Sequence, residues 1–264
     1  MNRSRRHFSK LSRWAGLCVL VGFLTVPAYA ALQPYAADVN TLHLWHFDEP
    51  GVPFEDAVAG GTNLTYLTGG ATAGSAGFTN NVVTFSNSVN FGSLTTSNAV
   101  LFPAGSGSVG TPVPFTFAGS DGAFTFEALV RIGFDPTNFV RSQPIQILNG
   151  DANNSGGGAR VFQFRLLPVG FVGGGGDTNV VRIEFINGTT TVAVAPIPTN
   201  GPDAIASNNW YHIAVAYDGQ ANTADNLLFY WTLADTNRKS ANLIFGADMV
   251  SSLPGVGSAT TIFS

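Results

Sequence analysis

Apolar and polar residues alternate along residues 209–219, which read N-W-Y-H-I-A-V-A-Y-D-G. The alternation produces two interleaved sets, Trp210, His212, Ala214 and Ala216 on one side and Tyr211, Ile213, Val215 and Tyr217 on the other. Because successive side chains of a strand point to opposite faces, this pattern predicts a β-strand with one face on a core. The Asp-Gly pair that follows predicts a turn at its end.

Similar alternation and short apolar runs predict further strands along the chain, and no segment has convincing helical periodicity. The predicted strands are residues 41–47, 64–67, 82–85, 99–102, 124–132, 145–148, 161–167, 180–186, 190–195, 213–217, 227–233 and 243–245. Gly, Asn, Asp, Ser and Pro fill most of the gaps between them, which suits antiparallel meanders and Greek-key returns. The sequence therefore predicts an all-β domain.

Three segments resemble a known family. They are W-Y-H-I-A-V-A-Y-D-G at 210–219, L-W-H-F-D-E-P-G at 44–51 and F-T-F-E-A-L-V at 124–130. They resemble strands of laminin-G-like, concanavalin A-like jelly-roll domains, although Leu129 stands where that family usually has tryptophan. The resemblance implies a two-sheet antiparallel jelly-roll β-sandwich, used mostly for extracellular binding. It indicates a fold better than a function, because such sandwiches include lectins, adhesion modules, glycosidases and spacers.

The first thirty residues have the pattern of an export signal. Five basic residues (Arg3, Arg5, Arg6, Lys10 and Arg13) precede an apolar run over 14–26, and Ala28-Tyr29-Ala30 forms a small-x-small cleavage sequence. S-R-R-H-F-S-K at 4–10 resembles the twin-arginine signal, with Ser9 in place of leucine; an arginine-rich Sec signal is the alternative. We predict a signal peptide over 1–30 and one sandwich domain over 31–264, secreted, periplasmic or at the cell surface.

Cleavage after Ala30 would change the charge of the chain. It removes five of the 12 basic residues and none of the 16 acidic ones, which leaves a net charge of −9. Such a surface argues against nucleic acid and anionic membranes as partners, and no second membrane-spanning segment is predicted. The one cysteine, Cys18, lies within the signal, so hydrophobic burial must stabilise the mature domain without disulfides.

The carboxylates do not form the pattern expected of a glycoside hydrolase. Hydrolysis needs two carboxyl groups about 5–10 Å apart, and jelly-roll glucanases usually carry them two residues apart on one strand. The four glutamates are Glu49, Glu55, Glu127 and Glu184, and neither strand glutamate, Glu127 nor Glu184, has a second carboxylate at that spacing. We therefore expect a domain without catalytic activity; a glycosidase with an unusual site is the least favoured alternative.

An oxygen-rich loop after the strand at 213–217 is the candidate calcium site. Its candidate ligands are Asp218, Asn222, Asp225 and Asn226. Calcium prefers six to eight oxygen ligands, and laminin-G-like sandwiches often bind it at one rim. The alternative is that Asp and Asn occur here because they stabilise turns through their own backbone.

Tyr230 and Trp231 are the candidate sugar-binding aromatics. Because they are neighbours on one predicted strand, they face opposite ways and only one can enter the core. Ordinary cross-strand packing is the alternative for the other. His43 and His46 also face opposite ways, so we expect no shared metal, and His212 is expected to have a structural role at the edge of the core.

These observations predict an exported, non-catalytic binding domain, with a glycan or glycoprotein as the partner that the resemblance implies. The alternative is a structural or adhesion module of a surface assembly without a small-ligand site. Members of the resembling family end in a further D-E-V strand beside the first strand, and none follows residues 243–245 here. We expect this last strand to be missing, which leaves 41–47 as an unpaired edge. Alternatively, residues 259–263 replace it by pairing with a neighbour.

Overall fold

The structure is a computed structural model, which describes residues 35–68, 70–79, 85–91, 99–101, 113–115, 122–139, 144–151, 160–188, 190–235, 240–250, 257–259 and 261–263. The predicted signal peptide and most of the predicted strand at 82–85 lie outside these residues. Within the described ranges the chain is all-β, and every strand pair is antiparallel. No described helix is long and apolar enough to cross a membrane.

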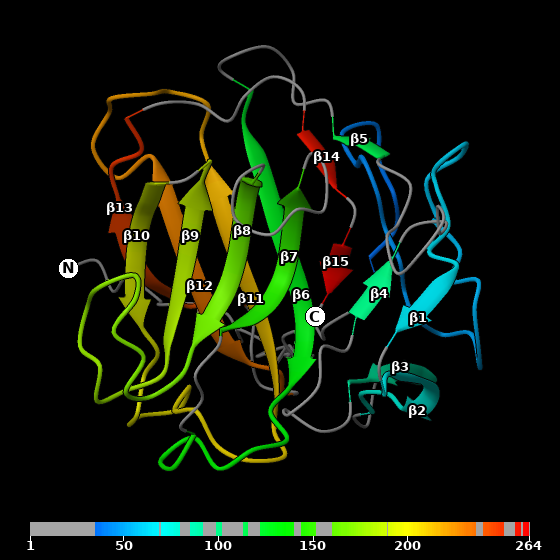
Figure 1. Ribbon diagram of the computed structural model, residues 1–264, viewed down its shortest axis with the longest axis horizontal. Helices are drawn as coiled ribbons and strands as arrows, with labels where there is room; N and C mark the ends of the chain where they lie inside the picture. Colours follow the sequence, from blue (N-terminus) through cyan, green and yellow to red (C-terminus); the bar gives the residue numbers. More distant parts are fainter. Residues whose placement is uncertain are drawn as a thin grey trace, which may run out of the picture.

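Two large sheets lie face to face (Figure 1), which is the arrangement of a β-sandwich. The seven-stranded sheet has the order β1-β4-β15-β7-β8-β9-β10, and the four-stranded sheet has the order β13-β12-β11-β6. Two-stranded pairs are formed by β2 with β3 and by β5 with β14. The strands of the seven-stranded sheet are Tyr66–Thr68 (β1), Ala99–Leu101 (β4), Thr261–Phe263 (β15), Ile145–Asp151 (β7), Arg160–Leu167 (β8), Arg182–Asn187 (β9) and Thr190–Pro196 (β10).

The remaining strands form the four-stranded sheet and the two short pairs. The four-stranded sheet comprises Leu243–Ala247 (β13), Leu227–Leu233 (β12), Trp210–Tyr217 (β11) and Phe124–Arg131 (β6). The short pairs comprise Thr72–Ala76 (β2), Asn87–Asn90 (β3), Val113–Phe115 (β5) and Gly257–Ala259 (β14). The predicted strand at 227–233 coincides with β12, whereas β2, β3, β5 and β14 were not predicted. These four strands are short, and most lack a clear alternation.

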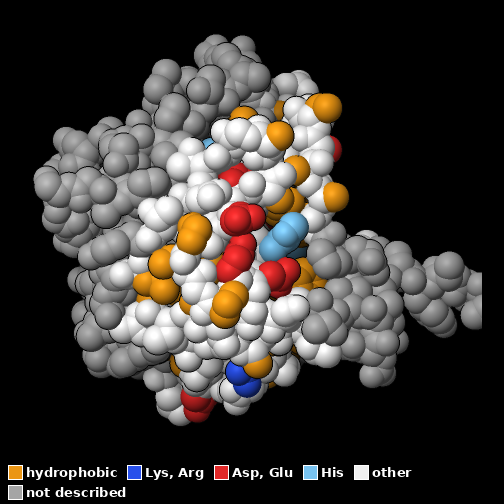
Figure 2. Space-filling view, turned by 90° about the vertical axis from the view of Figure 1, so that its right-hand side faces the viewer, with side chains coloured by type: hydrophobic (Ala, Val, Ile, Leu, Met, Phe, Trp, Pro, Cys, Tyr) orange, Lys and Arg blue, Asp and Glu red, His pale blue; other side chains and the backbone are white. Residues whose placement is uncertain are grey.

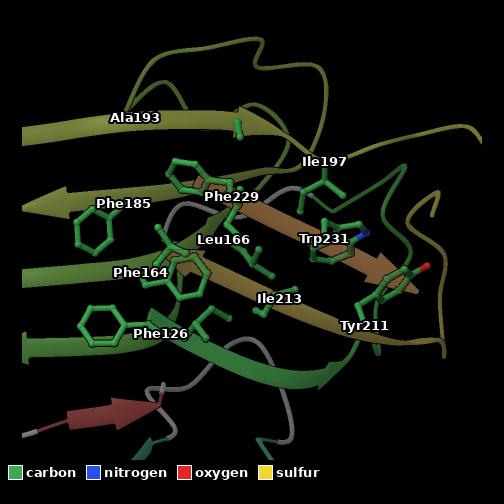
Figure 3. Packing of buried hydrophobic residues seen from close by; sticks show 14 of the residues in the cluster. Phe126, Phe164, Leu166, Phe185, Ala193, Ile197, Tyr211, Ile213, Phe229 and Trp231 are labelled. Atoms are coloured by element: carbon green, nitrogen blue, oxygen red, sulfur yellow. The ribbon is translucent and has the colours of Figure 1, made fainter. Parts of the chain in front are cut away.

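The core fills the space between the two large sheets (Figure 3). Phe126, Ile213 and Phe229 enter it from the four-stranded sheet, and Phe164 and Phe185 from the seven-stranded sheet. Burial of each such side chain contributes about 1.5–3 kcal/mol to the free energy of folding. Every second residue of β11 is buried, so the core-facing set predicted from the sequence alternation is confirmed.

The predicted first strand at 41–47 is wrong. Only an isolated bridge between Trp45 and Asp56 forms there, and Phe47 has a positive φ of 58° that interrupts an extended backbone. Within this segment the Leu44 N–H is accepted by the Asp56 side chain, described below, and the Leu44 carbonyl accepts the Ala57 N–H at 2.8 Å. At the other end of the sequence, β15 lies between β4 and β7, which is the pairing expected if terminal residues replace a last strand.

Candidate functional site

The candidate site lies on the face of the four-stranded sheet that points away from the core. Phe126, Ile213 and Trp231 face inward, so the alternating neighbours along the same strands face outward. The strand register then places Tyr230, Ala214 and Glu127 in one row across β12, β11 and β6. Tyr230 and Glu127 are two strands apart, about 10 Å. Ala214 contributes only a methyl group between them.

Glu127 is the centre of a polar cluster on this face. Its Oε2 atom lies 2.9 Å from His212 Nε2 and 2.9 Å from the hydroxyl of Tyr35. The Tyr35 hydroxyl also lies 3.2 Å from His212 Nε2. The Glu127 side chain is 35% exposed and Tyr35 is 46% exposed, so solvent reaches the cluster. Residues far apart in the sequence therefore meet here at one carboxylate.

The positions of the protons in this cluster follow from what the carboxylate requires. An ionised carboxylate only accepts hydrogen bonds, so His212 Nε2 carries a proton and donates it to Glu127. The Tyr35 hydroxyl donates to the same oxygen. Burial raises the pKa of Glu127, but the hydrogen bonds from His212 and Tyr35 outweigh this and leave its pKa below the usual range. Burial, together with the Glu127 charge, raises the pKa of Tyr35.

This arrangement makes Glu127 an ionised hydrogen-bond acceptor. His212 Nε2 already holds a proton, so this nitrogen cannot act as a base, and Tyr35 is held in its neutral form. Sequence reasoning did not connect these three residues, because 85 and 92 positions separate Glu127 from His212 and Tyr35, respectively. The alternation of β6 and β11 does give a signal, since it places both Glu127 and His212 on outward faces.

The two candidate aromatics separate as the sequence predicts, and one of them is excluded as a ligand-binding residue. Trp231 is 0% exposed, its ring stacks on Tyr211 with centroids 4.5 Å apart, and its Nε1 donates to the Asp203 carbonyl at 3.1 Å. A wholly buried ring cannot receive a ligand, so the candidate role of Trp231 is wrong. Tyr230 is half-buried on the outward face. Leu243 of β13 pairs with Tyr230 of β12 and is 51% exposed.

The candidate calcium loop connects β11 to β12 at one end of this sheet. Asn226 is excluded as a ligand, because it is buried and its side chain binds the backbone of Gln220 and Met249. Asp218 Oδ1 accepts the Gln220 N–H at 2.8 Å, while Asn222 and Asp225 adopt positive φ angles. These are the turn interactions that Asp and Asn favour. In the described ranges no three His, Cys, Asp or Glu side chains form a metal site. Calcium at Asp218, Asn222 and Asp225 stays a prediction.

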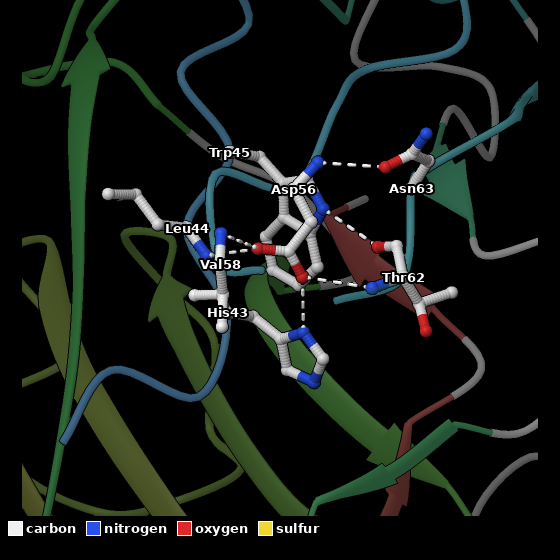
Figure 4. Close-up of polar contacts among 7 residues, drawn as sticks. All are labelled: His43, Leu44, Trp45, Asp56, Val58, Thr62 and Asn63. Atoms are coloured by element: carbon white, nitrogen blue, oxygen red, sulfur yellow. Dashed lines mark hydrogen bonds and ion pairs between the residues drawn. The ribbon is translucent and has the colours of Figure 1, made fainter. Parts of the chain in front are cut away.

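A second polar cluster surrounds Asp56 (Figure 4). Its buried carboxylate accepts the backbone N–H groups of Leu44, Val58 and Thr62, each at 3.0 Å, and lies 2.6 Å from His43 Nδ1. None of the sequence motifs described above marks Asp56 for this role. The carboxylate organises the segment that lacks strand pairing, and its oxygens are already occupied by donors. The cluster is therefore structural.

Acidic side chains gather near a histidine on the side of the molecule that faces right in Figure 1 (Figure 2). In the segment that follows Phe47, Asp48 and Glu55 are exposed and Glu49 is half-buried. Glu49 Oε1 accepts the Glu55 N–H at 2.9 Å, and Asp48 Oδ1 accepts the Ser86 N–H at 3.1 Å. These contacts tie the loop to its neighbours and give no arrangement suited to a metal ion.

The other strand glutamate, Glu184, lies on the outward face of the seven-stranded sheet. Its side chain is 0% exposed, forms an ion pair with Arg165 and accepts the Thr191 hydroxyl at 2.7 Å. Arg182 donates to the carbonyls of Gly175 and Phe171, which holds the glycine-rich loop against this face. Glu127 and Glu184 point away from each other on opposite sides of the core. The packed sheets themselves are about 10 Å apart, and both side chains point outward, so the two carboxylates are farther apart than the roughly 10 Å limit for groups that flank one glycosidic bond.

Comparison of the chain with protein-family models, with curated proteins and with solved structures finds no match.

Proposed function

We propose that this chain is an exported, non-catalytic binding domain that recognises a glycan, free or on a glycoprotein, through the outward face of its four-stranded sheet. The observation that carries the proposal is the ionised, solvent-accessible Glu127 carboxylate in one row with the outward ring of Tyr230. A carboxylate accepts hydrogen bonds from sugar hydroxyls, and an aromatic ring offers an apolar surface with a polar edge.

The same geometry supports binding over hydrolysis. Glu127 is held ionised by two donors, so it does not supply the raised-pKa acid that glycoside hydrolysis requires. Glu184, the other strand carboxylate, is buried and paired with Arg165. A glycosidase with an unusual site is the least favoured alternative; release of reducing sugar from any bound oligosaccharide would establish it.

A glycan array tests the proposal directly. The mature domain, residues 31–264, is applied with calcium and with chelator, alongside Glu127→Gln, Tyr230→Ala and Tyr230→Phe. Glu127→Gln keeps the shape of the side chain but removes its charge, and Tyr230→Phe keeps the ring but removes the hydroxyl. Glu55→Gln, on an exposed loop, is the matched control for the loss of one carboxylate.

We expect saturable binding that Glu127→Gln and Tyr230→Ala weaken at least tenfold, about 1.4 kcal/mol. Tyr230→Phe and Glu55→Gln should retain it. A blank array in both conditions would reject glycan binding and favour the structural or adhesion module. That second candidate is supported by Asp56 and Glu184, whose buried carboxylates have partners within the chain.

Export is proposed from the amino-terminal sequence. The twin-arginine pathway reads its arginine pair as an address and not as charge. Arg5→Lys combined with Arg6→Lys should therefore leave the precursor inside the cell, while mature protein from the wild type should begin at Ala31. Normal export of the double variant would reject this pathway but would leave a Sec signal as the alternative.

A further inference from the structure

The N-terminal arm, residues 35–40, rests on the candidate site by a single residue. Every residue of the arm is exposed, and the turn at its end is closed within itself by Asp38 and Thr41. In the described ranges, Tyr35 makes the hydrogen bonds that link the arm, beyond this turn, to the rest of the chain, one to β6 and one to the segment at 41–47. Its hydroxyl donates to Glu127 Oε2, and its carbonyl lies 2.7 Å from His46 Nε2. The arm is thus held by two separate hydrogen bonds at one residue.

The Tyr35 hydroxyl has the chemistry that a sugar hydroxyl would bring to Glu127. It is a neutral O–H donor attached to a ring, and its hydrogen bond occupies one acceptor position of the Glu127 carboxylate, beside His212. A ligand hydroxyl that approaches Glu127 from the open side of the sheet would compete for the same oxygen. Among the described residues no other arm residue forms a hydrogen bond to the sheets, so the cost of displacing the arm is close to the cost of breaking the two Tyr35 hydrogen bonds.

We infer that Tyr35 is an intramolecular stand-in for a ligand hydroxyl, and that the N-terminal arm competes with the glycan for Glu127. This inference rests on the proposed glycan-binding function and adds regulation to it. When the arm is docked, which we call the closed state, Tyr35 covers part of the Glu127 carboxylate. A ligand binds only when the arm is displaced. The observed affinity is then the affinity of the open site reduced by the fraction of molecules that are open.

Two variants loosen the arm through different atoms. Tyr35→Phe removes the hydroxyl that reaches Glu127, and His46→Ala removes the contact to the Tyr35 carbonyl without altering any group at Glu127. Thr41→Val is the matched control, because it disturbs the turn within the arm and leaves both Tyr35 contacts intact. Hydrogen exchange of the peptide that covers residues 35–40 reports on the arm, and titration with the best oligosaccharide from the array reports on the site.

Both loosening variants should exchange faster over residues 35–40 and should bind the oligosaccharide about threefold to tenfold more tightly than the wild type, while Thr41→Val keeps the wild-type affinity. Unchanged exchange in Tyr35→Phe would overturn the inference, because Tyr35 would not then hold the arm. Faster exchange with unchanged or weaker affinity would overturn the competition and would indicate that Tyr35 contacts the ligand itself. A blank array for every variant would instead reject the proposed function, whatever the exchange rates, and the competition with it.

Discussion

Glu127 and Glu184 both point outward from their sheets but have opposite surroundings. Each lies on a strand between core-facing residues, and each points outward. Glu184 is wholly buried between Arg165, Thr191 and the glycine-rich loop, whereas Glu127 remains 35% exposed with one donor from a loosely held arm. The comparison indicates that the covering of a sheet face, and not the strand pattern beneath it, decides whether a carboxylate stabilises the fold or is available to a ligand.

The largest expected difference between the two faces is in stability. Glu184→Ala leaves the largely buried Arg165 guanidinium without its counter-charge, which should lower the free energy of unfolding by about 3–5 kcal/mol. Glu127→Ala removes a half-exposed partner and should cost about 0.5–1 kcal/mol. Chemical denaturation of both variants measures the difference. Equal losses would contradict the structural assignment of the Glu184 cluster.

A pair of glycines tests how closely the loop covers Glu184. Gly174 and Gly175 have similar positive φ angles, 83° and 81°, so alanine is strained by about 1–2 kcal/mol at either position. A Cβ on Gly174 would lie 2.5 Å from Glu184 Oε1, while a Cβ on Gly175 would meet nothing within 4 Å. Gly174→Ala should therefore destabilise the protein by about 1–3 kcal/mol more than Gly175→Ala. Equal melting curves for the two variants would show that the loop does not press on this carboxylate.

The sequence pattern predicted the strands of the four-stranded sheet much better than the segment at 41–47. Alternation predicted the strands β6, β11 and β12 and showed that Tyr230 and Trp231 must face opposite ways. It could not show that Trp231 was the residue of its pair to enter the core. The predicted strand at 41–47 failed because local alternation cannot anticipate a side chain such as Asp56, which satisfies backbone N–H groups that a neighbouring strand would otherwise pair. The role of Tyr35 likewise depended on a contact spanning 92 positions.

The outward face of the four-stranded sheet should also respond to pH. The pKa of Glu127 is lowered in the folded state, so its contribution to stability is present above about pH 4.3 and is lost as the pH falls through the lowered value. The pKa of Tyr35 is raised, so its contribution is present below about pH 10 and is lost as the pH rises through the raised value. The arm should stay docked between these limits.

Tyrosinate absorbance measures the alkaline limit of this window. Two tyrosines of the wild type, Tyr35 and Tyr211, should titrate above the ordinary value, and Tyr35→Phe should remove one of these two late titrations. Loss of the N-terminal arm contact should change the melting temperature little, because the group is half exposed. The late titration of Tyr211, whose pKa burial also raises, should persist in Tyr35→Phe. A late titration of unchanged amplitude in Tyr35→Phe would show that the pKa of Tyr35 is not raised.

The smallest expected effect is that of calcium on the loop at the end of the open sheet. With Asn226 committed to the backbone, Asp218, Asn222 and Asp225 supply too few side-chain oxygens for the six to eight ligands that calcium prefers. We therefore expect millimolar calcium to change the melting temperature by less than about 1 °C. A bound ion at ten times its dissociation constant would instead stabilise the fold by about 1.4 kcal/mol, or about 3–5 °C. Such a rise, reversed by chelator, absent with magnesium and lost in Asp218→Ala/Asp225→Ala, would establish the calcium site and reject the interpretation of this loop as turn chemistry alone.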